Sequence, residues 1–166
     1  DRVFDVPNSE NSLMGIAVGA SLNGTKVLVT HQRLDFFLLA MDQLVNAASK
    51  WFYMFGGKKP VPITIRLIIG RGWGQGPTHG QSLQAMFAHT PGLKVVMPAT
   101  PQDAGDMIVG GVNDGNPVVY IEHRWLHGIK SEVSMPFISY EIGEARVAKK
   151  GEDVTIVANS YAVVDR

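Results

Sequence analysis

The sequence predicts an α/β protein in which a parallel sheet is flanked by helices. Short apolar runs rich in β-branched residues alternate with longer amphipathic stretches along most of the chain, an alternation typical of strand–helix–strand crossovers. The run over 61–69 is almost continuously apolar, as in a strand buried on both faces of a parallel sheet. The 18 glycines and 9 prolines are more than a helical bundle would use.

The first helix and the first strand are expected near the amino end. Ser9 or Asn8 can cap a helix whose apolar residues recur at three- and four-residue spacing, and Asn23 with the following glycine can end it. The β-branched run over 27–29 then predicts a short strand.

A longer helix is expected after Asp35, whose carboxylate can cap it. Apolar residues recur at helical spacing as far as Ala48, and the pattern stops near Gly56 and Gly57. The 61–69 strand follows. The remaining elements are expected, in order, as a glycine-rich loop over 70–80, a helix over 82–89, a strand over 93–96, a helix opened by Thr100 and Pro101, and a strand over 118–121.

The chain is expected to divide into two unequal parts. Residues 1–135 form the α/β domain, and residues 136–166 form a linker with the first strand of a mostly absent C-terminal domain. Within this tail, 142–147 and 154–158 are expected as strands around a polar turn. The α/β domain itself is expected to be truncated at both ends.

Composition and charge exclude several classes of protein. The 15 basic and 15 acidic residues balance, so the chain lacks the basic field of a general nucleic-acid binder. No clean apolar run of about 18 residues is present, so no membrane span is expected. The absence of cysteine excludes disulfides and thiolate metal sites, and it fits the reducing compartment of a cytoplasmic protein.

Common site motifs fit poorly. The glycine-rich loop follows a predicted strand, but the next helix starts too late and no acidic residue ends the following strand, so a dinucleotide fingerprint is not supported. His123 and His127 are four residues apart, yet they lie in an expected loop rather than in a helical zinc motif. The Gly-x-Ser-x-Gly elbow of a serine hydrolase is absent.

Three residues have both an ordinary and a functional interpretation. Glu10 would be an ordinary first-turn carboxylate favoured by the helix dipole. Phe36 would by default be a core residue of an apolar helix, and His79, at the end of the glycine loop, can be structural or catalytic. The residue types alone leave these alternatives open.

Several segments of the chain form a combination that is specific in order and spacing. They include DVPNSE over 5–10, GIAVGA over 15–20, DQLVNAASK over 42–50, HGQSL over 79–83, FAHTPGLKVV over 87–96 and NPV over 116–118. Taken together, these segments resemble the beta subunit of the decarboxylating component of 2-oxo-acid dehydrogenase complexes. This is the pyruvate, branched-chain 2-oxo-acid and acetoin dehydrogenase group, related to the central domain of transketolase. The resemblance covers nearly the whole chain.

The resemblance implies a thiamin-diphosphate enzyme and a pyrimidine-binding domain. In the family, the glutamate at the position of Glu10 bonds a ring nitrogen of the aminopyrimidine and promotes formation of its imino tautomer. An aromatic residue at the position of Phe36 stacks on the pyrimidine, and the histidine at His79 acts on the substrate side. Many relatives also bind a structural potassium ion at the positions that correspond here to Ile63, Gly111, Val112, Asp114 and Asn116.

The sequence departs from this family at three positions near the implied site. Thr30 stands where many relatives have a glutamate, Gly80 stands where they have a serine, and His31 is unusual. These changes leave the cofactor residues intact but put the identity of the substrate in doubt.

The resemblance also implies partners. The Gly-Asp-Gly stretch that holds the cofactor's diphosphate through Mg²⁺ in the family is absent here, so an alpha-type subunit is expected to supply it. A lipoyl acyltransferase core would accept the acyl group, and the chain alone is expected to form a homo-oligomer and to be inactive. Two alternatives remain open: a transketolase-like carboligase half, for which Arg33, Arg71 and Arg124 are too scattered in sequence to argue, and a non-catalytic, self-associating remnant of the same fold.

Overall fold

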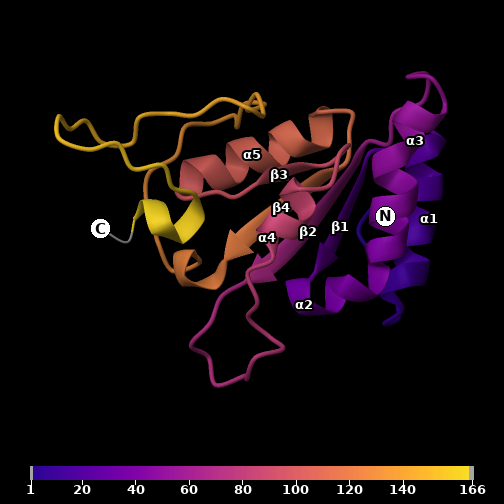
Figure 1. The fold of residues 1–166 in the computed structure, drawn as a ribbon, viewed down its shortest axis with the longest axis horizontal. Helices are drawn as coiled ribbons and strands as arrows, with labels where there is room; N and C mark the ends of the chain where they lie inside the picture. The colour runs from indigo at the N-terminus through magenta and orange to yellow at the C-terminus, as the bar shows by residue number, and fades with distance from the viewer. Residues whose placement is uncertain (1, 165–166) are drawn as a thin grey trace.

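The chain folds around a four-stranded parallel sheet flanked by helices (Figure 1), as the sequence predicts. The computed structural model describes residues 2–164. The strands are β1 (Val27–His31), β2 (Ile63–Ile69), β3 (Lys94–Val96) and β4 (Val118–His123), and their order across the sheet is β1-β2-β4-β3. Every neighbouring pair is parallel, so each connection between strands must cross over the sheet.

The two faces of the sheet bury two separate apolar clusters. Val119 and Ile121 of β4 belong to the larger cluster, whereas Val118 and Tyr120 belong to the smaller one. Alternate side chains of a strand point to opposite faces, so helices must cover both sides. The central strand β2 is accordingly buried along most of its length, which explains its nearly continuous apolar sequence.

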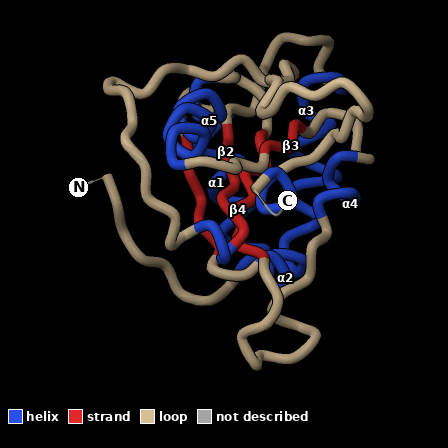
Figure 2. The backbone as a smooth tube through the Cα atoms, turned by 90° about the vertical axis from the view of Figure 1, so that its left-hand side faces the viewer, coloured by secondary structure: helices blue, strands red, loops and turns tan. Residues whose placement is uncertain are grey.

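Helices cover both faces of the sheet. Helix α1 (Glu10–Leu22) contributes Met14 and Ala17 to the larger cluster, together with Phe87 of α4 (Gln84–Ala88). Helix α5 (Pro101–Asn113) packs on the other face, against the smaller cluster. Figure 2 shows α5 on one side of the strands and α3 and α4 on the other.

The long helical stretch after β1 is confirmed, but its winding changes along its length. It comprises α2 (Leu34–Phe37), a 3₁₀ turn η1 (Leu38–Ala40), a π-helical segment η2 (Gln43–Ala48) and α3 (Ser49–Met54). The expectation that Asp35 caps this helix is wrong, because Arg33 occupies the N-cap position and the Asp35 carboxylate bonds elsewhere.

The predicted start of α5 is confirmed in detail. The Thr100 hydroxyl accepts a hydrogen bond from the Asp103 backbone N–H, the Asp103 carboxylate accepts one from the Thr100 backbone N–H, and Pro101 occupies the first helical position. This reciprocal capping box satisfies backbone donors that the helix itself leaves free. Ser9 stands at the N-cap of α1, but its side chain makes no capping bond.

The tail differs from the prediction. No strand forms over 142–147 or 154–158 in the described chain, because a strand requires a neighbour for its backbone hydrogen bonds and the tail lies over α5 instead. Ile138 donates its N–H to Asp106, and Arg146 forms an ion pair with Asp103 at 2.7 Å. A short 3₁₀ turn, η4 (Ser160–Val163), follows. The division of the chain after residue 135 stays a prediction.

Within residues 2–164, no helix combines the length and apolar character needed to cross a bilayer.

Candidate functional site

The predicted site residues lie around the carboxyl ends of the strands. His31 ends β1, Ile69 ends β2 beside His123 of β4, and the glycine-rich 70–80 loop leaves the sheet at the same edge. In Figure 1 this loop projects below the sheet, next to α2. Ligands of open parallel sheets bind outside the carboxyl ends of the strands, so the topology favours a site here.

Phe36 and His79 contact each other at this edge, although 43 positions separate them along the chain. Their ring centroids lie 5.2 Å apart at an interplanar angle of 85°, an edge-to-face contact. Phe36 is 43% exposed, whereas the neighbouring Phe37 is fully buried. The interpretation of Phe36 as a core residue is therefore wrong, and its ring is accessible to a ligand.

Two partly buried hydrogen bonds fix the loop that carries His79. Asp35 Oδ1 accepts hydrogen bonds from Gln81 Nε2 at 2.7 Å and from the Gln81 backbone N–H at 3.3 Å. Asp35 is only 8% exposed, so its carboxylate accepts these partly buried bonds with little competition from water, which strengthens a charge-assisted bond. Asp35 and Gln81 thus hold His79 beside Phe36. No local sequence signal indicates this role, because the two residues are 46 positions apart.

The negative charge of Glu10 acts on His31, which lies at the same edge of the sheet. It is the first residue of α1 and is half-buried. Burial lowers the pKa of His31, and the negative charge of Glu10 partly opposes that shift. The His31 ring also packs edge-on against Phe37, with its buried Nε2 lacking a hydrogen-bond partner. The departure from the family pattern at His31 therefore lies inside the site.

The 70–80 loop encloses a hollow of about 330 Å³ beside His79. The loop closes where Gly80 approaches the backbone of Gly70: a Cβ added at Gly80 would lie 2.6 Å from the Gly70 carbonyl oxygen. Gly80 is accordingly the residue that permits this closure, and the serine of many relatives would require the loop to shift.

The five predicted potassium ligands lie near the opposite edge of the sheet. Gly111 and Val112 are in the last turn of α5, and Ile63 begins β2. These carbonyl and carboxylate oxygens suit a hard cation in type, but the Asp114 carboxylate already has partners. Its Oδ2 lies 2.6 Å from Lys94 Nζ, and its Oδ1 accepts bonds from Asn116. A potassium ion would have to share Asp114 with Lys94, and this site stays a prediction.

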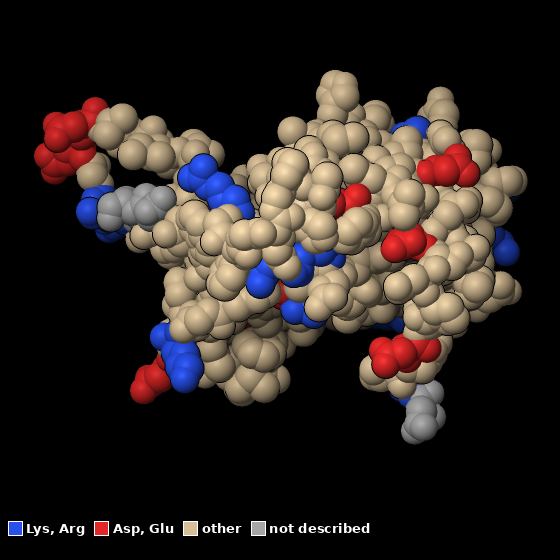
Figure 3. All heavy atoms as spheres, turned by 90° about the horizontal axis from the view of Figure 1, so that it is seen from below, with Lys and Arg blue, Asp and Glu red and all other residues tan. Residues whose placement is uncertain are grey.

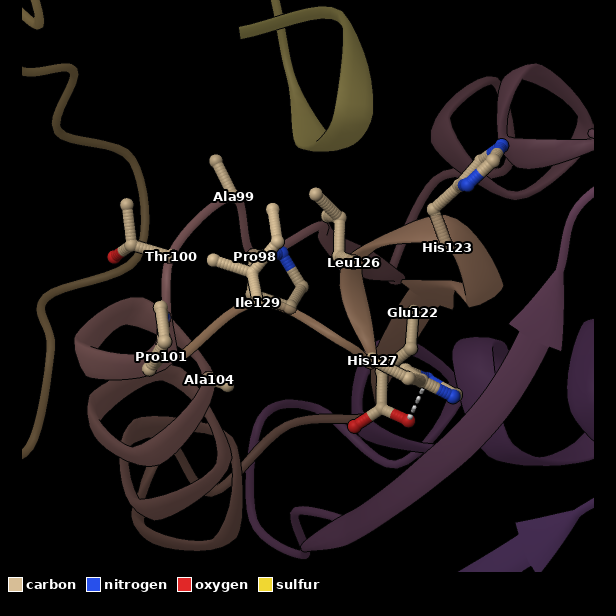
Figure 4. A pocket seen from close by; sticks show the side chains of 10 residues that line it. All are labelled: Pro98, Ala99, Thr100, Pro101, Ala104, Glu122, His123, Leu126, His127 and Ile129. Atoms are coloured by element: carbon tan, nitrogen blue, oxygen red, sulfur yellow. Dashed lines mark ion pairs between the residues drawn. The ribbon is translucent and has the colours of Figure 1, made fainter. Parts of the chain in front are cut away.

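A second hollow, of about 190 Å³, lies between the start of α5 and the segment after β4, which includes the 3₁₀ turn η3 (Arg124–Leu126). Figure 4 shows His127 beside Glu122, whereas His123 points away from both. His127 Nε2 lies 3.3 Å from Glu122 Oε2. The His123 ring stacks on Tyr161 instead. The two histidines therefore do not converge on one ion, and residues 2–164 contain no cluster of three or more potential His, Cys, Asp or Glu ligands.

Comparisons with known proteins identify a family and several relatives of this chain. The family model "Transketolase, pyrimidine binding domain" matches residues 1–128. The beta subunit of acetoin:2,6-dichlorophenolindophenol oxidoreductase from Cupriavidus necator is 39% identical over 163 residues, which are 98% of this chain and 48% of that protein. The beta subunit of the mitochondrial pyruvate dehydrogenase E1 component from Homo sapiens is 37% identical over 166 residues, or 98% of this chain and 46% of that protein.

A solved structure has the same fold. It is described as a split-gene transketolase, inactive β4 tetramer, and superposes with a TM-score of 0.70 at 22% identity, covering 90% of this chain and 45% of that one. The chain thus spans about half the length of the proteins it matches. The match of the family model over residues 1–128 shows that the chain belongs to the transketolase pyrimidine-binding domain family.

Proposed function

We propose that the chain supplies the pyrimidine half of a thiamin-diphosphate site in an enzyme that acts on 2-oxo acids. The observation that carries the proposal is the exposed Phe36 ring with His79 fixed against its edge, at the carboxyl end of a parallel sheet. The relatives are named as beta subunits of an acetoin oxidoreductase and of the pyruvate dehydrogenase E1 component, and these names support the same chemistry.

The residues present fit an aminopyrimidine ring. Phe36 offers an aromatic face on which a flat heterocycle can stack, and the half-buried carboxylate of Glu10 offers an acceptor for a ring N–H. His31 Nε2 and Asp35 Oδ2 are buried without hydrogen-bond partners, and unpaired polar atoms of this kind often mark a binding site. Aromatic, carboxylate and imidazole groups together are what a polar heteroaromatic ring requires.

Each residue has a distinct proposed role. When bound, thiamin diphosphate supplies the carbon nucleophile that adds to the carbonyl of a 2-oxo acid. Glu10 would hold and share a proton at a pyrimidine nitrogen, as a general acid–base catalyst does. Phe36 would fix the ring plane, and His79 would face the substrate carbonyl, where it can donate a proton to the developing alkoxide.

An alpha-type subunit is proposed to complete the site. The Gly-Asp-Gly stretch that holds the diphosphate through Mg²⁺ in the family does not occur in this sequence, so the oxygen ligands would come from that subunit. A lipoyl acyltransferase core would then take the acyl group. Calorimetric titration with thiamin diphosphate and Mg²⁺, with and without an alpha subunit, tests this dependence, and micromolar binding by the chain alone would contradict it.

The Glu10→Gln variant tests the proposed proton transfer. In the assembled enzyme, we expect it to slow hydrogen–deuterium exchange at the thiazolium carbon by about 10²–10⁴-fold, with little loss of folding stability. Glu152→Gln, in the exposed tail, is the matched control and should leave the exchange rate unchanged. An exchange rate unaffected by Glu10→Gln would reduce Glu10 to a residue that merely favours the helix dipole.

A non-catalytic, self-associating module is the second candidate. Consecutive apolar side chains are exposed at the end of α3, where Tyr53 is 87% exposed and Phe52, Met54 and Phe55 are also exposed. Exposed large apolar side chains of this kind favour association with a second copy, in which they would be buried. The calorimetric experiment separates the candidates, because a remnant module would not gain cofactor affinity from an alpha subunit.

A further inference from the structure

Buried polar atoms without hydrogen-bond partners concentrate at the carboxyl end of β1. Among the described residues, five buried side-chain nitrogen or oxygen atoms lack a partner, and three of them lie within five consecutive residues: His31 Nε2, Arg33 Nε and Asp35 Oδ2. Folded proteins rarely leave such atoms unpaired, because each one loses its bonds to water without a replacement. The connection between β1 and α2 therefore holds polar groups that the described chain does not satisfy.

His31 differs from the other two residues of this group. The Arg33 guanidinium donates to Gln75 and the Asp35 carboxylate accepts from Gln81, whereas the His31 ring makes no hydrogen bond within the described chain. His31 is nevertheless only 8% exposed. An apolar side chain would fill such a position at a lower free-energy cost, so the imidazole is expected to serve something other than folding.

Packing holds the His31 ring in one orientation. Its centroid lies 4.9 Å from that of Phe37, at an interplanar angle of 70°, and the Phe37 centroid lies 6.0 Å from that of Phe87. Both phenylalanines are fully buried. Phe37 belongs to α2 and directly follows Phe36, whose exposed ring is proposed to stack on the pyrimidine. The same short helix thus restrains both the stacking ring and the imidazole, as a preorganised site requires.

Glu10 is the charged residue that acts on His31. Helices α1 and α2 both pack against β1, and Glu10 is the first residue of α1. Burial lowers the pKa of His31, and the negative charge of Glu10 only partly opposes that shift. The ring is therefore neutral at neutral pH, with an N–H donor on one nitrogen and an acceptor on the other.

The Glu10 carboxylate has no cationic partner in the described chain. It belongs to none of the ion pairs between described residues. In Figure 3, which views the molecule from below, Lys and Arg side chains gather near the middle of the face, and Asp and Glu side chains lie over the half that contains α1 to α3. A bound ring and an added subunit would remove water from this carboxylate, which would then require donors from the protein.

We propose that His31 is a positioning residue that donates a hydrogen bond from Nε2 to the Glu10 carboxylate when the pyrimidine ring is bound. A carboxylate can accept several hydrogen bonds, so Glu10 can accept from the ring and from His31 together. A neutral donor orients the carboxylate without the ion pair that a lysine or arginine would form, and Glu10 remains able to share the pyrimidine proton. This role rests on the proposed thiamin-diphosphate function.

Two measurements on the chain alone test the proposal without thiamin diphosphate. Nitrogen-15 NMR above about pH 7 should show a protonated, pyrrole-type Nε2 in His31. His31→Leu removes an unsatisfied nitrogen, so its Tm should equal or exceed that of the wild type. Thr64→Val is the matched control, because it removes another buried, unpartnered atom, from the second residue of β2, and its Tm should respond in the same way.

A double-mutant cycle in the assembled enzyme tests whether His31 acts through Glu10. Hydrogen–deuterium exchange at the thiazolium carbon is compared in the wild type, His31→Leu, Glu10→Gln and the double variant. We expect His31→Leu to slow exchange by about tenfold or more, but to have no further effect in the Glu10→Gln background. His31→Gln retains an N–H donor and should recover part of the rate, whereas Thr64→Val should leave the rate unchanged.

Several results would overturn the proposal. In the chain alone, these are an unprotonated Nε2 or a lower Tm in His31→Leu, because His31 would then lack the donor or serve the fold. In the assembled enzyme, they are an unchanged rate in His31→Leu, the same fold-change in both Glu10 backgrounds, no recovery in His31→Gln, or an equal loss in Thr64→Val. An unchanged rate in Glu10→Gln would instead refute the proposed function, and this inference with it. If Glu10→Gln slows exchange and His31→Leu does not, only this inference fails.

Discussion

The bonds between Asp35 and Gln81 predict a measurable coupling energy. The carboxylate is buried and accepts two hydrogen bonds from one residue, at 2.7 and 3.3 Å. Bonds to charged groups contribute about 1.5–3 kcal/mol, but Asp35 Oδ2 is buried without a partner, which offsets part of that gain. We therefore expect Asp35→Ala and Gln81→Ala each to lower the free energy of unfolding by about 1–3 kcal/mol.

A double-mutant cycle isolates the interaction between these two residues. Urea unfolding of the wild type, both single variants and the double variant should give a coupling energy of about 1–2 kcal/mol. Hydrogen exchange should also show faster exchange in the 70–80 loop of either variant. The exposed bond between Ser82 and Gln84 provides a control, for which Gln84→Ala should cost less than about 0.5 kcal/mol. A coupling energy near zero would refute the idea that Asp35 anchors the loop.

The remaining predictions concern the loop closure, the histidine in the site and assembly. Gly80→Ser should destabilise the chain by about 1–3 kcal/mol in urea unfolding, because its Cβ would meet the Gly70 carbonyl, whereas Gly128→Ser, with open space around it, should be nearly neutral. Burial lowers the pKa of His31, so the unfolded chain binds more protons. The contribution of His31 to the free energy of unfolding is therefore fully present above about pH 6.5. It is lost as the pH falls from there toward the lowered pKa of the folded state. Glu10→Gln should lower the His31 pKa further, as measured by NMR titration, and an unchanged pKa would place Glu10 too far from His31. The chain alone should sediment as a homo-oligomer, and a clean monomer at micromolar concentration would contradict the inferred interface.

Local sequence signals were sufficient for much of the fold. The 61–69 strand was predictable because burial on both faces requires a continuous apolar run, and the start of α5 was predictable because Thr100, Pro101 and Asp103 fulfil a short-range capping rule. The prediction of strands in the tail was wrong for a related reason. Apolar residues over 154–158 satisfy a strand pattern, but pairing depends on a neighbouring strand that local sequence does not reveal.

The site contacts depend on distant pairs, which a single sequence does not show. Asp35 and Gln81 are 46 positions apart, and Gln75 is 42 positions from Arg33 and 49 from Arg124. Each of these side chains has an ordinary local interpretation as a helix cap or an exposed loop residue. Only the parallel topology, which gathers the carboxyl ends of β1, β2 and β4 at one edge, brings them together.

The energies available to this half-site explain why it would depend on a partner. Glu10 can contribute one charge-assisted hydrogen bond of about 1.5–3 kcal/mol, and Phe36 one aromatic stack of about 0.5–1.5 kcal/mol. Together these interactions barely reach the lower estimates of the free-energy cost of association. That cost, which comes from lost translational and rotational freedom, is about 4–15 kcal/mol. Affinity for thiamin diphosphate should then be millimolar or weaker until a diphosphate–Mg²⁺ anchor is added. Cofactor binding would thus be coupled to subunit assembly, and an unassembled chain would not hold a reactive cofactor.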